Sequence, residues 1–292
     1  MSEADRAWLA EELGKTRKYA GLAPRTLERV AEGALRVSRS RREALKRAKR
    51  KLHQIHGAFW APLDYGRIEG VVSELERDKV WRPAGSEEEE RREVSLRFAS
   101  AGILSLHTSS AERLAGMEEF YRALFSSAGL LDDGGEGKEG PQRILDLGCG
   151  LHPFGVPWMG LPPAAEYVAV DIDAPLMELV QRFLRVVGQP GRGVTEDVLE
   201  WSPRERFDVA LLMKLLPTLE RQERGAARRL LCSLDAPVMA VSFPRTSLGG
   251  RVHGMDSSYA ALMRELCRAC SLEEHERLMF DFEAVYVCRR RG

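Results

Sequence analysis

Hydrophobic residues recur with two different periods along the chain, and the change of period falls near residue 104. In the first part, apolar residues return every three or four positions, which is the period of an amphipathic helix. The breaks GLAP and WRPAGS supply the glycine and proline that interrupt helices. The pattern predicts helices over residues 3–13, 24–37, 39–58, 66–80 and 86–104.

In the second part, short apolar runs rich in β-branched residues replace the helical period, and helical segments over 174–187, 218–233 and 256–269 separate several of them. A bridging helix after residue 107 precedes the first run. Strands that alternate with helices form right-handed crossovers, so a parallel, doubly wound sheet is expected. The predicted strands are RILDLG (143–148), EYVAVDI (166–172), GVTED (193–197), FDVALLM (207–213) and PVMAVSF (237–243).

The last two strand candidates, LEEHERLM (272–279) and AVYVCRR (284–290), have no helix between them. They are expected to form an antiparallel hairpin that closes a seven-stranded sheet. The fold class is therefore α/β, with a Rossmann-like seven-stranded sheet and a helical domain before it. We expect a basic helical domain over 1–104 and a sheet domain over 105–292.

The composition sets broad limits on the class of protein. The 292 residues suffice for a sizeable core, and no apolar run approaches the length of a membrane span. The N-terminus lacks a signal-peptide pattern, so a cytoplasmic location without a membrane partner is expected. The five cysteines follow no regular framework, which favours free thiols. Cys267 and Cys270 form a single CxxC with no second pair at zinc-ligand spacing, so no metal is expected.

A formal net charge of zero conceals a basic N-terminal segment. Residues 1–52 hold fifteen Lys and Arg against seven Asp and Glu, and residues 36–51 hold nine basic residues against Glu43 alone. The apolar stripe of this helical segment consists of Leu45, Ala48, Leu52 and Ile55. The other faces are cationic. They can be ordinary solvated faces, but a surface of one sign repels itself unless a polyanion neutralises it, which favours nucleic acid.

Candidate cofactor residues follow three of the predicted strands. The first strand runs into Gly148-Cys149-Gly150, where glycine permits a tight turn and lets a ligand approach main-chain N–H groups. The third glycine of the dinucleotide fingerprint is missing, which disfavours NAD. Asp171 ends the second strand and Asp197 follows the third, at positions where carboxylates can accept from ribose hydroxyls and an adenine amine. This order is typical of S-adenosylmethionine-dependent methyltransferases.

The segment after the fourth strand limits which chemical group of a base the enzyme can be expected to methylate. Enzymes that methylate exocyclic base amines usually carry an Asn/Asp-Pro-Pro-aromatic motif there, whereas this chain has Met-Lys-Leu-Leu-Pro over 213–217. Methylation of a pyrimidine carbon needs a cysteine beside a proline, and the chain has no such pair. Guanine N7 has a free lone pair and needs in-line positioning without a general base. The absence of an obvious His or Cys catalyst is consistent with that target.

Four segments resemble one family of RNA-modifying enzymes. They are KLHQIHGAFW (51–60), HTSSAERL (107–114), MKLLPTLERQ (213–222) and SLDAPVMAVSFPRTSLGGRVHGM (233–255). These segments are similar to the aminoglycoside-resistance 16S rRNA methyltransferases, which modify N7 of guanine 1405 in the decoding-site helix of the small ribosomal subunit. The resemblance runs from about residue 15 to the end of the chain and is most specific over 205–260.

The resemblance implies S-adenosylmethionine as cofactor and gives several positions a role. Asp171 would hold the ribose, Asp197 and Val198 the adenine, and Arg113 the methionine carboxylate. Lys214 and Glu220 would support the pocket. The other cofactor-binding residues that the resemblance implies are Phe59, His107, Gly148, Gly150, Met213 and Gln222.

The resemblance also implies the partner, which is the small ribosomal subunit and not DNA, bound by a monomer. Arg251, Met255 and Ser258 would position an extruded guanine, and no side chain would act as catalytic acid or base. The residues expected to contact RNA phosphates are Lys15, Arg17, Lys18, Arg41, Arg42, Lys46, Arg50 and Arg251.

The chain departs from this family at two positions. Ser258 stands where members tend to have Asn, and Ala111 stands where they often have a basic residue. Two alternatives remain open at this point. One is a methyltransferase of the neighbouring decoding-site adenine N1, which the SLGGR segment and the long helical part disfavour. The other is a non-catalytic RNA-binding protein, which Gly148, Gly150, Asp171 and Asp197 disfavour.

Overall fold

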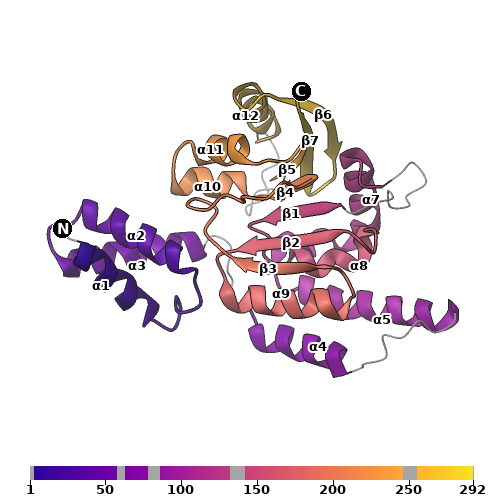
Figure 1. The fold of residues 1–292 in the computed structure, drawn as a ribbon, viewed down its shortest axis with the longest axis horizontal. Helices are drawn as coiled ribbons and strands as arrows, with labels where there is room; N and C mark the ends of the chain where they lie inside the picture. Colours follow the sequence, from indigo (N-terminus) through magenta and orange to yellow (C-terminus); the bar gives the residue numbers. More distant parts are fainter. Residues whose placement is uncertain (1–2, 58–62, 78–85, 132–141, 246–254, 292) are drawn as a thin grey trace.

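A single twisted sheet forms the centre of the molecule (Figure 1). The computed structural model describes residues 3–57, 63–77, 86–131, 142–245 and 255–291. Within them, the seven strands are β1 (Arg143–Leu147), β2 (Glu166–Asp171), β3 (Gly191–Thr195), β4 (Val209–Leu212), β5 (Val238–Pro244), β6 (Leu272–Met279) and β7 (Glu283–Arg290). Their order in the sheet is β3-β2-β1-β4-β5-β7-β6.

The predicted sheet is confirmed. The pairs β1–β2, β1–β4, β2–β3 and β4–β5 are parallel, whereas β7 runs antiparallel to both β5 and β6. All residues of β4 are buried, as expected for a strand covered on both faces. Parallel strands all end at one edge of the sheet. The segments that follow β1, β2, β3 and β4 therefore meet there.

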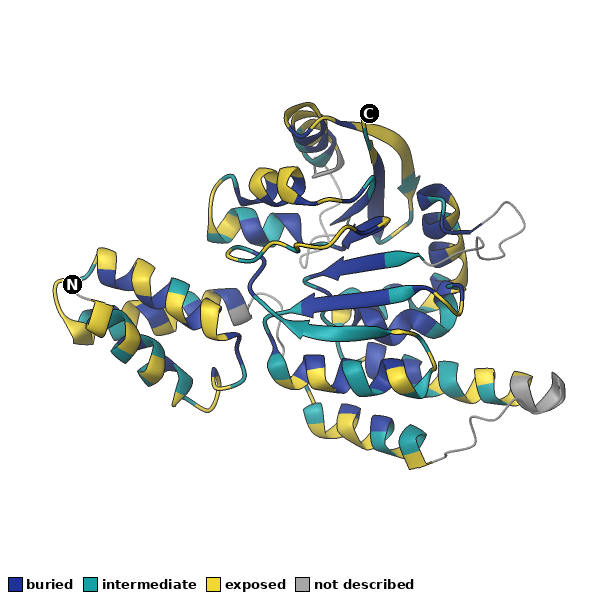
Figure 2. Ribbon diagram, in the orientation of Figure 1, coloured by how far each residue is buried: buried dark blue, intermediate teal, exposed yellow. Residues whose placement is uncertain are grey.

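Helices cover the two faces with separate buried clusters. One cluster joins alternate residues such as Ile144 and Val209 to α7 (Met117–Ala128), α8 (Val156–Met159) and α9 (Ala174–Val186). The other joins Leu145 and Ala210 to α10 (Leu216–Gln222), α11 (Ala226–Ser233) and α12 (Met255–Ala269). This division follows from the alternation of side chains along a strand. Figure 2 shows β1, β2, β4, β5 and β7 buried over most of their length, whereas β3 is intermediate and the edge strand β6 is largely exposed.

Two predicted helices are interrupted. The helix expected over 218–233 is two helices, α10 and α11, because Gly225 adopts a left-handed φ of 81° between them. The Glu220 carboxylate accepts hydrogen bonds from the N–H groups of Gly225 and Ala227, at 2.9 and 2.8 Å, and so caps α11. The bridging helix after residue 107 likewise consists of α6 (Thr108–Ala111), a short 3-10 turn (Leu114–Gly116) and α7.

The N-terminal helices form a small unit with a core of its own. It contains α1 (Glu3–Gly14), α2 (Pro24–Arg36) and α3 (Arg41–Gly57), close to their predicted ranges. Ala48, Leu52 and Ile55 of the predicted stripe on α3 are buried in this core, and Leu45 packs against it. We call these three helices the α1–α3 unit. Figure 1 shows it beside the sheet, and Figure 2 shows its exposed outer faces.

The next two helices pack on the sheet instead. Ile68 of α4 (Tyr65–Arg77) and Ile103 of α5 (Ser86–Leu104) belong to the buried cluster that contains β1. Arg182 of α9 forms ion pairs with Glu69 and Glu76 of α4, which holds α4 against the sheet domain. A domain boundary at residue 104 remains a prediction. This packing favours a boundary between α3 and α4.

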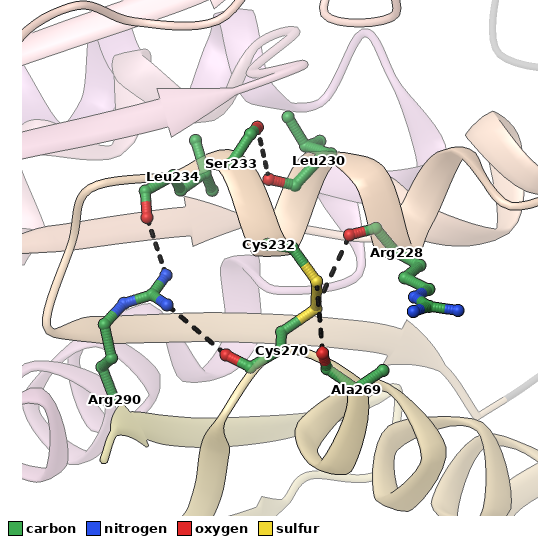
Figure 3. Close-up of a disulfide and its surroundings, with 8 residues drawn as sticks. All are labelled: Arg228, Leu230, Cys232, Ser233, Leu234, Ala269, Cys270 and Arg290. Atoms are coloured by element: carbon green, nitrogen blue, oxygen red, sulfur yellow. Dashed lines mark hydrogen bonds between the residues drawn. A yellow bond between two sulfur atoms is a disulfide. The ribbon is translucent and has the colours of Figure 1, made fainter. Parts of the chain in front are cut away.

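Two of the five cysteines are not the free thiols that the sequence predicted. Cys232 at the end of α11 and Cys270 after α12 form a disulfide (Figure 3). The packing of α11 against α12 joins residues that lie 38 positions apart, a pairing that cysteine spacing alone does not indicate. Cys149, Cys267 and Cys288 are free, as predicted, and all three are buried. The Sγ atoms of Cys267 and Cys288 lie 3.6 Å apart.

Reduction of the disulfide is expected to lower the melting temperature. In the chain-entropy description, closing a loop of this length restricts the unfolded chain and stabilises the fold by about 4 kcal/mol. Thermal melts with and without dithiothreitol measure the effect. Cys232→Ser, at an exposed site, should melt like the reduced wild type under both conditions. Equal melting of oxidised and reduced wild type would contradict a stabilising role.

Candidate active site

One pocket lies at the edge where the parallel strands end. It brings together nine of the ten residues that the sequence analysis assigned to the cofactor. These nine are His107, Arg113, Gly148, Gly150, Asp171, Asp197, Val198, Met213 and Gln222. The tenth, Phe59, lies outside the described residues. Segments separated by more than a hundred residues in sequence thus share one concave site.

The turn after β1 forms one wall of this pocket. Gly148 and Gly150 have φ values of 60° and 51°, in the left-handed region that glycine adopts without strain. A Cβ on Gly148 would lie 2.6 Å from Cδ1 of Leu215, so a side chain there would collide with the wall. The Gly150 N–H donates to Oδ2 of Asp171 at 3.0 Å. The glycine turn therefore also fixes the carboxylate at the end of β2.

Asp171 presents its carboxylate to the pocket. It is half-buried and lines the pocket. Desolvation by the surrounding protein raises its pKa to about 6, although the hydrogen bond from Gly150 acts in the opposite direction. The neighbouring Asp173 is buried, accepts hydrogen bonds from the Leu176 N–H and the Tyr65 hydroxyl, and caps α9.

Asp197 stands at another wall and has an unexpected partner. The Arg29 guanidinium, from α2, donates to its Oδ2 atom through Nε at 2.9 Å and lies 2.8 Å away through Nη2. Nη2 of Arg29 also donates to Oε1 of Gln222 at 3.2 Å. The sequence analysis missed Arg29, since 168 positions separate it from Asp197 and it belongs to no motif.

A buried ion-pair cluster forms beside Met213. The Arg113 guanidinium donates to both carboxylate oxygens of Glu283, at 2.8 and 2.7 Å, and lies over the Phe120 ring. Burial disfavours the charge on Glu283, but the Arg113 charge and hydrogen bonds outweigh burial and lower the pKa of this carboxyl. The Lys214 ammonium contacts Glu112 at 2.7 Å and Glu283 at 3.6 Å. Arg113 retains further N–H donors beyond the two that Glu283 accepts.

Lys214 has a backbone conformation that is uncommon for its residue type. Its φ of 53° lies in the left-handed region, where residues with a Cβ are disfavoured. The Lys214 N–H donates to the hydroxyl of Ser242 on β5, at 2.9 Å, which helps to hold the turn after β4. Strain of this kind persists where the surroundings impose it, and it is concentrated at functional sites.

A second buried network lies behind the glycine turn. Oδ2 of Asp146 accepts a hydrogen bond from the Tyr167 hydroxyl at 2.7 Å and lies 2.9 Å from Nδ1 of His152. Nε2 of His152 and Oδ1 of Asp146 are buried and have no hydrogen-bond partner among the described residues. His152 lines the pocket. Buried polar atoms normally have a partner, so the unpartnered Nε2 of His152, a residue of the pocket lining, is a candidate contact for a polar ligand group.

Seven of the eight basic residues expected to contact RNA, all except Arg251, are exposed on the α1–α3 unit. Several already have protein partners: Lys15 pairs with Glu11 and Glu12, Arg41 pairs with Asp5, and Lys18 contacts His53. Of these seven residues, Arg17, Arg42, Lys46 and Arg50 have neither an ion pair nor a side-chain hydrogen bond to another described residue. These four carry charge that no neighbouring acid compensates.

The expected target-positioning residues are only partly described. Arg251 lies outside the described residues, Met255 is the first residue of α12, and Ser258 is exposed on its first turn. Across the described ranges, no three His, Cys, Asp or Glu side chains converge as metal ligands. The helices in those ranges also include none that is long and apolar enough to span a membrane.

The donor set of the pocket fits S-adenosylmethionine. It combines carboxylates at the ends of adjacent strands, an arginine, and a glycine turn with exposed backbone near unpartnered polar atoms. The seven-stranded sheet and this pocket are those of an S-adenosylmethionine-dependent methyltransferase. More narrowly, the chain belongs to the ribosomal RNA methyltransferase (FmrO) family, which it matches over residues 15–274. The family expected from the sequence is confirmed.

Similar proteins cover nearly the whole chain. A 16S rRNA (guanine(1405)-N(7))-methyltransferase from Micromonospora rosea is 35% identical, over 97% of this chain and 96% of its own. A protein of the same name from Serratia marcescens is 32% identical, over 95% of each chain. The crystal structure of the 16S rRNA methyltransferase RmtF in complex with S-adenosyl-L-homocysteine has a TM-score of 0.78 at 32% identity, with 100% of each chain covered.

Asp171→Asn is expected to weaken S-adenosylhomocysteine binding about ten- to hundredfold without destabilising the protein, because an amide accepts hydrogen bonds less strongly than a carboxylate. The pKa of Asp171 is raised to about 6 in the folded protein. Its contribution to stability is therefore present below its unfolded pKa of about 4 and lost as the pH rises through about 6. At pH 7 the variant should consequently melt no lower than wild type.

Calorimetry from pH 7.5 to pH 5.5 provides the pH test. Affinity of the wild type should fall below about pH 6 as Asp171 gains a proton, and this dependence should be smaller in Asp171→Asn. Glu178→Gln, on the exposed side of α9, is the matched control. Wild-type affinity in the folded Asp171→Asn variant would remove Asp171 from the cofactor site.

Proposed function

We propose that this protein methylates N7 of guanine 1405 of 16S rRNA in the assembled small ribosomal subunit, and thereby confers aminoglycoside resistance. The observation that carries the proposal is the match to guanine(1405)-N(7)-methyltransferases, which extends over 97% of this chain. The assembled pocket with intact Gly148, Gly150, Asp171 and Asp197 supports an active enzyme. Its ribosomal substrate implies that it acts in the cytoplasm, and we propose that it acts as a monomer.

The chain's own residues would hold the two reactants in line. Bound S-adenosylmethionine supplies an electrophilic methyl group on a sulfonium. Asp171 would accept from its ribose hydroxyls, Asp197 and Val198 would contact the adenine, and Arg113 would pair with the carboxylate of the methionine part. Guanine N7 carries a lone pair and no proton, so the protein has no proton to remove. Catalysis would then depend on orientation, which agrees with a pocket held by buried ion pairs.

The α1–α3 unit would provide most of the contacts to rRNA. Its uncompensated Arg17, Arg42, Lys46 and Arg50 are the strongest candidates for phosphate contacts, since an arginine already paired with a carboxylate must give up that partner first. Arg251, Met255 and Ser258 would contact the extruded guanine near the carboxyl end of β5.

Chemical mapping of the product tests the proposed function. Purified small subunits are incubated with the protein and S-adenosylmethionine, then treated with borohydride and aniline, which cleave RNA at N7-methylguanine. Reverse transcription should stop at guanine 1405 only in treated subunits. A stop at the neighbouring adenine without chemical cleavage would indicate N1 methylation instead. No modification despite measurable cofactor binding would indicate a non-catalytic RNA-binding protein.

Reversal of two uncompensated charges on α3 should weaken subunit binding. Arg42→Glu/Lys46→Glu removes two expected phosphate contacts. The slope of the logarithm of the binding constant against the logarithm of the salt concentration should therefore become shallower by about 0.7–0.9 units per contact. Cofactor affinity should stay the same. The matched control is Arg204→Glu/Arg206→Glu, an exposed pair just before β4, at the opposite edge of the sheet from the pocket. An unchanged salt dependence of subunit binding in the α3 variant would show that this basic face of α3 is only solvated and does not contact RNA.

Arg251→Ala should lower the methylation rate far more than it lowers subunit affinity. Docking would be distributed over many phosphate contacts, whereas few side chains can hold one extruded base, and a misplacement of about 1 Å can cost on the order of a hundredfold in rate. Single-turnover methylation and subunit affinity, measured together, separate the two effects. A wild-type rate in this variant would show that Arg251 does not position the target.

A further inference from the structure

The α1–α3 unit contacts the cofactor pocket through the side chains of Arg29 and Lys51 and through backbone hydrogen bonds. The Arg29 guanidinium reaches Asp197 and Gln222, as described above, and Nζ of Lys51 donates to the Gln222 carbonyl oxygen at 3.1 Å. At the end of β2, the Ala23 N–H donates to the carbonyl oxygen of Ile172 at 2.7 Å. The Ala174 N–H donates back to the carbonyl oxygen of Gly21 at 2.8 Å. The unit is therefore held at two separate walls of the pocket.

At the end of β2, the backbone of Gly21 packs closely against Pro175 at the start of α9. A Cβ on Gly21 would lie 2.7 Å from Cδ of Pro175, so only glycine fits between the α1–α3 unit and the start of α9. Backbone hydrogen bonds in both directions fix the path of the chain on either side of Asp173. The start of α2 is thereby fixed against the sheet domain, and Arg29 extends from the second turn of this anchored helix.

Arg29 holds the Asp197 carboxylate from the side opposite its own turn. Oδ1 of Asp197 accepts from the Leu199 N–H at 3.0 Å, while Oδ2 accepts from Arg29. The exposed fractions of the two side chains are only 3% for Asp197 and 14% for Arg29, so water competes little for this pair. The carboxylate is thus fixed in one orientation. Removal of Arg29 would leave a buried anion whose side chain keeps only the Leu199 hydrogen bond among the described residues, which favours rotation of the carboxylate.

Arg29 also determines the orientation of the Gln222 amide. A guanidinium has donors and no acceptor, so the amide atom that faces it must be the oxygen. The NH₂ group of Gln222 is consequently directed away from Arg29. Without the arginine, either atom of the amide could face the pocket.

We propose that Arg29 is a positioning residue of the cofactor site, which acts through Asp197 and Gln222 to fix the end of the pocket that receives the adenine. The assignment rests on the proposed function, in which Asp197 accepts from the adenine amine. It gives the α1–α3 unit a second role besides RNA docking, since the unit completes the pocket from the side opposite the sheet. The simpler alternative is that Arg29 only attaches the unit to the sheet domain.

Ligand affinities of matched variants separate these roles. Arg29→Met removes the charge and the donors, and Arg29→Lys keeps the charge but loses the fork geometry. Arg25→Met is the control, because Arg25 lies on the same helix and faces Glu196 and the Glu200 carbonyl without reaching Asp197. Calorimetry with S-adenosylhomocysteine should show binding about ten- to hundredfold weaker for Arg29→Met, intermediate binding for Arg29→Lys and nearly wild-type binding for Arg25→Met.

A second ligand identifies the part of the cofactor that Arg29 affects. S-inosylhomocysteine has an oxygen in place of the adenine amine, so it lacks the donor that Asp197 would accept from. The wild type should prefer S-adenosylhomocysteine, and Arg29→Met should lose most of that preference. Loss of affinity for both ligands by the same factor would show that Arg29 supports the pocket only in general, and would overturn the assignment.

The remaining outcomes are equally decisive. Wild-type affinity in folded Arg29→Met, or an equal loss in Arg25→Met, would also overturn the assignment. If Arg29→Met does not fold, Arg29→Lys is compared with Arg25→Met on the same two ligands. A wild type that binds S-adenosylhomocysteine but leaves 16S rRNA unmodified would contradict the proposed substrate, while the affinities would still decide the role of Arg29.

Discussion

The parallel pairing of β1 with β2 and β4 is the constraint on which the site depends. In this register Leu147 lies opposite Val170 and Asp146 lies opposite Leu211, so the three strands end within one residue or two of each other. The glycine turn, Asp171 and Met213 therefore reach the same edge although α8 and α9 lie between them in sequence. Ligands of open α/β sheets bind at such an edge, because loops diverge there and leave a crevice.

Buried ion pairs around this crevice fix the orientation of pocket side chains, at a cost in desolvation free energy. Arg113 with Glu283, and Arg29 with Asp197, are ion pairs whose side chains have little contact with water. Such pairs contribute little net stability, because desolvation opposes their attraction. Their value lies in orientation: each fixes a side chain in one direction before a ligand arrives. A reaction that needs alignment and no proton transfer gains most from groups held in this way.

The α1–α3 unit is attached at the cofactor pocket and not at a distant surface. Its contacts with Ile172, Asp197 and Gln222 mean that a displacement of the unit also displaces pocket groups. If rRNA binds the outer face of the same unit, the two binding events share a structural element and are thermodynamically linked. Any such coupling is reciprocal, since each ligand must change the affinity for the other by the same factor.

The amino-acid sequence alone predicted the elements and their order, because hydrophobic periodicity reports locally which faces are buried. It indicated the closing β6–β7 hairpin and the strand-end positions of Asp171 and Asp197. It did not indicate the break at Gly225, where the Glu220 side chain competes for backbone N–H groups. Nor did it indicate the Cys232–Cys270 disulfide, Glu283 as partner of Arg113, or Arg29 beside Asp197. These contacts join residues 38 to 170 positions apart, and only the packing of α2, α11, α12 and β7 against their neighbours decides them.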